Sequence, residues 1–151
     1  MKQMFKCENG NLFPLDDCIC ISVLRPDEVQ ILFKSEDVTY YAKVGTVDKQ
    51  NVSRDCYNIV RKDYDRLVAE RTKEMFKCEN GDLFSLDTCI SMSELCSEAV
   101  RKLWEKEGIT YYAELCITDV AKSFLVRQNI TRKDYDCLSE VYIDPISGNH
   151  I

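Results

Sequence analysis

Apolar and polar residues alternate in two segments of the chain, and this spacing predicts β-strands. The segments are 38–44 and 109–115, and both contain the sequence Thr-Tyr-Tyr-Ala. A weaker alternation over 18–22 predicts a short strand. One face of the strand over 38–44 would carry Val38, Tyr40, Ala42 and Val44.

A different spacing covers 26–36 and 97–107. Apolar residues stand three and four positions apart at Val29, Leu32 and Phe33, and the second segment repeats this pattern. That spacing favours a helix, and Gly108 is a typical helix stop. The rival interpretation is a hairpin leading into the next strand, because Val29–Phe33 taken alone resembles a strand.

The period changes again after each predicted strand. We expect a helix over 119–128, interrupted at Asn129, and then a final helix that continues through Leu138. Thr131 and Asp134 resemble a capping box at the start of that helix, although Asp is the shorter acid for this motif.

A hairpin is predicted near the N-terminus, over Phe5–Phe13. Asn9 and Gly10 both tolerate positive φ, as a type I′ turn requires. Asn80 and Gly81 predict the same turn later in the chain.

The chain also matches itself when it is shifted by 71 residues. Between residues 4–67 and 75–138, 31 of 64 positions are identical. The longest identities are Met4–Gly10 with Met75–Gly81 and Arg61–Asp65 with Arg132–Asp136. Such a match predicts a tandem duplication.

The predicted fold class is therefore α+β, built from two copies of a unit of about 71 residues. Each unit would contain a β-hairpin, a short strand, a helix, a strand and two helices. The predicted repeats are 1–74 and 75–151, with no Gly- or Pro-rich linker between them. We expect the copies to pack with pseudo-twofold symmetry, because one such unit alone buries little apolar surface.

Composition narrows the classes of function. Of 151 residues, 45% are hydrophobic and 30% are charged, and the net charge is −6. The acidity disfavours direct nucleic-acid binding, which needs a basic field. No apolar run reaches the length of a bilayer span, and no signal peptide is evident, so a cytoplasmic protein is expected.

Catalytic chemistry has few candidates. The single histidine, His150, lies next to the C-terminal residue, and no nucleotide-binding or hydrolase motif occurs. The nine cysteines are expected to be reduced and mostly structural, since Cys18 and Cys20 are one residue too close for a zinc pair. We therefore expect no enzyme, no cofactor and no metal.

Two recurring groups remain as candidates for binding a partner. Tyr41 and Tyr112 could present rings on an exposed sheet face, although a role in the core is the simpler interpretation. Repeated acids follow in the Arg-Lys-Asp-Tyr-Asp blocks, where favourable interaction with the helix start is the simpler interpretation. These acids are Asp63, Asp65, Asp134 and Asp136.

The leading hypothesis is a non-catalytic protein-binding module, either a monomer or a homodimer, whose partner is another protein. In size and acidity the chain resembles small inhibitor proteins of phages and mobile elements, including anti-CRISPR proteins. That resemblance implies a target that handles nucleic acid or serves in host defence. The alternative is a small ligand or nucleotide bound at the seam between the repeats, near Tyr41, Tyr112 and Lys43.

Overall fold

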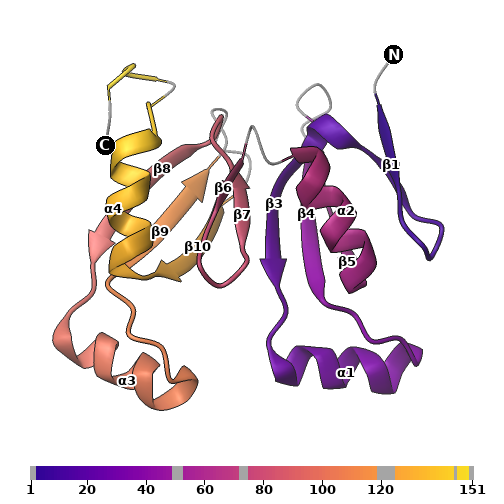
Figure 1. The fold of residues 1–151 in the computed structure, drawn as a ribbon, viewed down its shortest axis with the longest axis horizontal. Helices are drawn as coiled ribbons and strands as arrows, with labels where there is room; N and C mark the ends of the chain where they lie inside the picture. The colour runs from indigo at the N-terminus through magenta and orange to yellow at the C-terminus, as the bar shows by residue number, and fades with distance from the viewer. Residues whose placement is uncertain (1–2, 49–52, 72–74, 119–124, 145, 150–151) are drawn as a thin grey trace. The chain divides into compact units, whose positions relative to one another are not determined.

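The computed structural model describes residues 3–48, 53–71, 75–118, 125–144 and 146–149 (Figure 1). The chain separates into two compact units, Met1–Ser85 and Leu86–Ile151. Both are built from helices and antiparallel sheets, which confirms the α+β class.

The first unit has a five-stranded antiparallel sheet in the order β5-β4-β3-β7-β6 and a separate two-stranded sheet, β1-β2. Its elements are β1 (Met4–Lys6), β2 (Leu12–Pro14), the short 3-10 helix η1 (Leu15–Asp17), β3 (Cys18–Val23), α1 (Pro26–Glu36), β4 (Ala42–Asp48), β5 (Ser53–Ile59), α2 (Arg61–Arg71), β6 (Met75–Lys77) and β7 (Leu83–Ser85).

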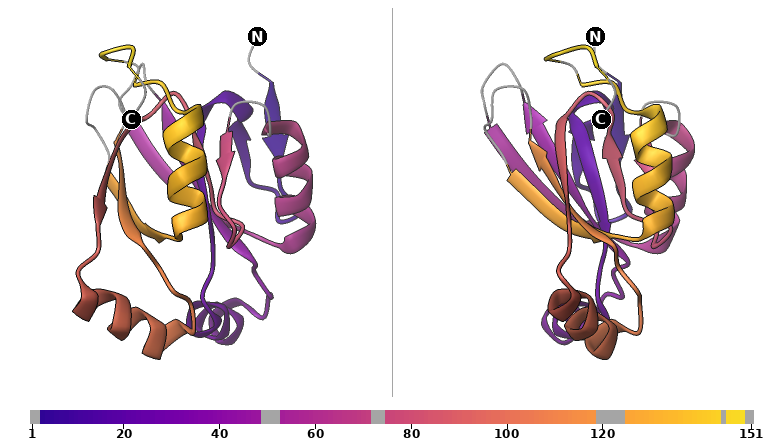
Figure 2. Two further views of the ribbon diagram at one scale, coloured as in Figure 1. Left: turned by 60° about the vertical axis from the view of Figure 1, so that its left-hand side comes forward. Right: turned by 90° about the vertical axis from the view of Figure 1, so that its left-hand side faces the viewer.

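The second unit has a three-stranded antiparallel sheet in the order β10-β9-β8, with α4 across one face (Figures 1 and 2). Its elements are β8 (Cys89–Glu94), α3 (Ser97–Glu107), β9 (Ala113–Thr118), β10 (Leu125–Ile130) and α4 (Arg132–Val141).

The core of the first unit forms where α2 and the hairpins β1–β2 and β6–β7 meet the strands β3, β4 and β5. Burial of the apolar side chains in this core is the main force that holds the unit together. The cluster consists of Phe5, Cys7, Phe13, Leu15, Cys18, Ile21, Ala42, Val44, Ile59, Tyr64, Leu67, Met75 and Leu83.

The elements recur at the offset of the sequence repeat. β3 and β8 start at Cys18 and Cys89, a difference of 89 − 18 = 71. α1 and α3 show the same difference, since they start at Pro26 and Ser97. The helix predicted over 26–36 and 97–107 is confirmed, and its hairpin rival is wrong.

The second element after each of these helices, β5 after α1 and β10 after α3, is a strand where the prediction placed a helix. The helix predicted over 119–128 is wrong where the chain is described, because Leu125–Ile130 is a strand in register with β9. Leu125 and Arg127 are exposed while Ile130 is buried, so the segment follows strand alternation. Residues 119–124 lie outside the described part of the chain.

Two local predictions need smaller corrections. The strands predicted over 38–44 and 109–115 begin later, at Ala42 and Ala113. The hairpin turn is not type I′, since Gly10 has a φ of 97° but Asn9 is not among the residues with positive φ. The Gly10 N–H donates to the Cys7 carbonyl, and only the glycine needs the left-handed conformation.

The predicted start of the last helix is confirmed. The side-chain hydroxyl of Thr131 accepts a hydrogen bond from the Asp134 N–H at 3.3 Å, as an N-cap does. His150, the single histidine, lies outside the described residues.

Strand pairing in the first unit includes a hairpin from the second repeat. β6 and β7 begin at Met75, yet β7 pairs with β3 through Cys20 opposite Phe84 and Ile21 opposite Leu83. The first compact unit therefore extends to Ser85 and includes the first hairpin of the predicted second repeat, while the repeat boundary between 74 and 75 stays a prediction. The predicted pseudo-twofold packing stays a prediction.

Candidate partner-binding surfaces

Tyr41 lies in a compact group at the start of α2. Its ring meets that of Tyr64 edge-on, with centroids 4.9 Å apart, and the guanidinium of Arg61 lies 4.5 Å from its centroid. Arg61 also pairs with Asp65, with Nε and Oδ1 3.0 Å apart. We call these four residues the first Arg–Tyr stack.

The second unit contains a matching group at the start of α4. Tyr112 meets Tyr135 edge-on at 5.0 Å, and Arg132 lies 4.6 Å from the Tyr112 centroid. Arg132 pairs with Asp136 at 3.0 Å. We call Tyr112, Tyr135, Arg132 and Asp136 the second Arg–Tyr stack.

Each stack joins one predicted tyrosine and one predicted acid through an arginine, and a role of these residues in binding a partner stays a prediction. One contact of each predicted tyrosine is an arginine, whose positive charge is attracted to the ring face. The arginine is in turn held by an exposed carboxylate, an arrangement that orders the first turn of the helix. Tyr112 also donates to Glu94 at 2.5 Å, and this hydrogen bond raises the pKa of Tyr112.

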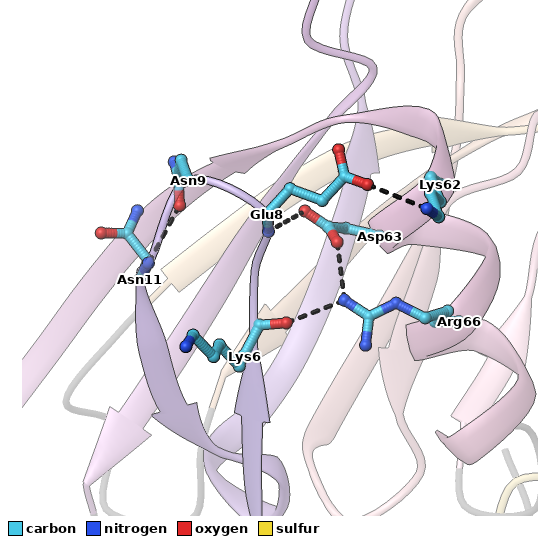
Figure 3. Close-up of polar contacts among 7 residues, drawn as sticks. All are labelled: Lys6, Glu8, Asn9, Asn11, Lys62, Asp63 and Arg66. Carbon is cyan, nitrogen blue, oxygen red and sulfur yellow. Dashed lines mark hydrogen bonds and ion pairs between the residues drawn. The ribbon is translucent and has the colours of Figure 1, made fainter.

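The other predicted acids are buried, unlike Asp65 and Asp136. Asp63 accepts a hydrogen bond from the Glu8 N–H at 3.1 Å and pairs with Arg66 at 2.7 Å (Figure 3). Arg66 also donates to the Lys6 carbonyl at 2.8 Å. Asp63 thus fastens the β1–β2 hairpin to α2, a structural role that spacing along the helix does not reveal. Asp134, the corresponding acid of α4, is also buried.

Asp63→Ala is expected to lower the free energy of unfolding by about 1–3 kcal/mol, because the Glu8 N–H and Arg66 both lose the buried carboxylate that they contact. The matched control is Asp65→Ala, which removes an exposed i,i+4 pair worth about 0.3–0.5 kcal/mol. Urea denaturation of both variants measures the difference. Equal losses in the two variants would contradict the role of Asp63 as a fastener.

The sequence reasoning missed a second kind of surface, formed by α1 and α3. Neither helix contains a buried residue. Phe33 is 48% exposed and Trp104 is 56% exposed, although both occupy apolar positions of the predicted helical pattern. The spacing identified the helices, but it did not show how little of each apolar stripe is covered.

The placement of these helices explains their exposure. Each connects two neighbouring antiparallel strands, β3 with β4 and β8 with β9, and lies beyond the strand ends rather than across a sheet face (Figure 1). A shallow groove beside α3 is lined by Leu95, Ser97, Val100, Arg101, Trp104 and Thr110. Another beside α1 is lined by Leu24, Glu28, Ile31, Leu32, Lys43, Cys56 and Asn58.

Thiol chemistry is suppressed where the cysteines are buried. All nine cysteines are free thiols. Burial raises the pKa of Cys18 to about 12, with a further increase from the neighbouring Cys20 and an opposing effect of Arg71. Such a thiol stays neutral at physiological pH and is a poor nucleophile.

The part of the chain that the structure describes contains neither a metal-binding cluster nor a membrane-spanning helix. Across the described ranges, no group of three or more His, Cys, Asp or Glu side chains is arranged to hold a metal ion. Within the same ranges, no helix combines the length and apolar character needed to cross a membrane. The proposed ligand site at the seam between repeats depends on residues of both units and stays a prediction.

No protein-family model matches the chain, and neither a curated protein nor a solved structure shows a significant match to it. The exposed helices α1 and α3 are therefore the features from which a function can be proposed.

Proposed function

We propose that the chain is a non-catalytic protein-binding module that engages its partner through the outer faces of α1 and α3. The observation that carries this proposal is the exposure of Trp104 on a helix with no buried residue. Trp104 lines the groove beside α3 together with Leu95 and Val100, and tryptophan is enriched among residues that dominate binding energy.

The apolar residues of the helices are flanked by charges that would form a polar rim. α3 carries Glu98 and Lys102 as an i,i+4 pair at 3.1 Å beside its apolar stripe. A hydrophobic centre within a polar rim is the usual composition of a protein interface. The net charge of −6 favours a partner with a basic surface, as an inhibitor of a nucleic-acid-handling protein would meet.

The proposal is tested by affinity capture from a lysate of the source organism, with the full chain as bait. We expect one dominant protein partner, retained by the wild type and lost by the Trp104→Ala and Phe33→Ala double variant. Truncation of a central aromatic anchor typically costs about 2 kcal/mol or more in binding free energy. Because rim charges act through screened electrostatics, capture should also weaken as salt is raised.

Ile146→Ala is the matched control, because Ile146 is an exposed apolar residue outside the two helices. It should keep the partner at the wild-type level. Capture that survives the double variant, or that is lost equally in the control, would count against α1 and α3 as the binding surface.

A further inference from the structure

The pairing between β3 and β7 joins a strand edge to a hairpin, and we call it the connector. The sequence contains the two parts of this connector twice, but within the described residues the structure pairs only one set. Along this edge the Val23 N–H also donates to Asp82 Oδ1 at 2.6 Å. In the 71-residue repeat, β2 corresponds to β7 and β8 corresponds to β3. Among the described strands, however, β2 pairs with β1 alone and β8 pairs with β9 alone.

The two hairpins, β6–β7 and β1–β2, differ in how much of their apolar side chains is exposed. Met75 and Leu83, which point from β6 and β7 into the core of the first unit, are 6% and 1% exposed. Their counterparts in the β1–β2 hairpin, Met4 and Leu12, are 50% and 51% exposed. The N-terminal hairpin therefore carries the same apolar pair with nothing comparable covering it.

The strands that a hairpin edge could pair with, β3 and β8, also differ in burial. Cys18 and Ile21 of β3 are fully buried, whereas the corresponding Cys89 and Met92 of β8 are only partly buried. On the adjacent helix, Tyr64 is 4% exposed and its counterpart Tyr135 is only partly buried. Part of the apolar surface that a hairpin covers in the first unit is accessible in the second.

Turn geometry gives an independent sign of the same asymmetry. A Cβ at Gly81 would lie 3.0 Å from Val23 Cγ2 and 3.2 Å from the Tyr64 hydroxyl, whereas one at Gly10 would have no neighbour within 4 Å. Tyr64 donates a hydrogen bond to the Gly81 carbonyl at 2.5 Å. The occupied connector is thus tightly fitted, and its counterpart at Gly10 is open.

We propose that the β1–β2 hairpin of one copy of this chain pairs with β8 of a second copy, repeating the internal connector between molecules. The shift of 71 residues sets the register. Leu12 would lie opposite Met92 (83 − 71 and 21 + 71), and Phe13 opposite Ser91 (84 − 71 and 20 + 71). Asn11 would accept the Glu94 N–H through its side-chain oxygen, as Asp82 accepts that of Val23.

The contact joins two different surfaces, a hairpin edge and a sheet edge, so it is heterologous. Copies joined this way form either a closed ring or a chain that grows with concentration. Adding a strand to an open sheet edge is a common mode of protein association, since it satisfies backbone groups and apolar side chains together. This assembly does not depend on the partner proposed for α1 and α3.

Sedimentation velocity across a wide range of concentration tests the proposal with the full chain. The wild type should rise from 17.5 kDa to at least twice that mass. Leu12→Asp, which damages the hairpin, and Met92→Asp, which damages the receiving edge, should each remain at 17.5 kDa alone. An equal mixture of the two should reach twice 17.5 kDa and no more, because it retains one intact hairpin and one intact edge.

Two further variants keep the test independent of folding defects. Leu12 and Asn11 are exposed, so Leu12→Asp should fold normally, and Asn11→Ala should fold normally and weaken self-association. Leu125→Asp alters an exposed residue of β10, the opposite edge of the three-stranded sheet, and should associate like the wild type. The proposal is overturned by a wild type that stays at 17.5 kDa throughout, by a Leu12→Asp variant that still self-associates, or by a mixture that does not combine.

Discussion

Leu83→Ala is expected to lower the free energy of unfolding by about 2–5 kcal/mol, the usual cost of removing a fully buried leucine side chain. Leu83 is 1% exposed and belongs to the core of the first unit, even though it lies in the second repeat. Its loss would open a cavity against Ile21 and its neighbours and weaken the pairing of β7 with β3. Urea denaturation followed by circular dichroism measures the change.

The repeat supplies a matched control for this experiment. Leu12→Ala makes the same chemical change in the same Leu-Phe context, but Leu12 is exposed, so the expected loss is within about 0.5 kcal/mol in dilute solution. The assignment of β6 and β7 to the first unit would be refuted by similar losses in the two variants.

The second large effect is expected at alkaline pH, where Cys18 links ionisation to folding. Burial raises the pKa of Cys18 from 9.0 to about 12, so the folded state keeps the proton while the unfolded state releases it from about pH 9. The contribution of this thiol to stability is complete below pH 9 and is lost as pH rises toward 12. The slope is about 1.4 kcal/mol per pH unit over that window.

Urea denaturation at several pH values under reducing conditions measures the slope. Cys18→Ala should remove the contribution of this thiol, leaving a flatter decline from the remaining groups. Ile21→Val is the control, because it lowers stability by about 0.5–1.5 kcal/mol at every pH and adds no titrating group. An unchanged slope in Cys18→Ala would show that Cys18 does not carry the effect.

Prediction from sequence succeeded where local chemistry decides the structure. The helix over 97–107 follows from its apolar spacing and from Gly108, which has a φ of 71° at the helix end. The Thr131 cap was equally local. Prediction failed over 125–128, where a change in the spacing of apolar residues suggested a helix although Leu125–Ile130 pairs along its whole length with β9. Tertiary pairing overrides local propensity in such short segments.

The candidate site shows the same limit. The repeat identified Tyr41 and the paired acids, but sequence spacing did not show that Arg61 lies over the Tyr41 ring or that Asp63 binds the N–H of Glu8. Those partners come from segments far apart in the chain. The exposure of Trp104 was also not predictable, because an apolar residue at helical spacing is ordinarily buried.

α1 and α3 can differ from each other without disturbing the strands that flank them. Each helix is inserted between strands that already pair directly, so its outer surface can change without altering strand register. Within these two segments only three residues are shared, and all serve as anchors: Val29 and Leu32 are partly buried, and Glu36 accepts the Tyr40 hydroxyl at 2.9 Å. Their equivalents do the same in α3, where Glu107 accepts the Tyr111 hydroxyl at 3.1 Å. The outer surfaces of α1 and α3 can therefore carry different side chains, while the contacts that anchor each helix to its own unit stay the same.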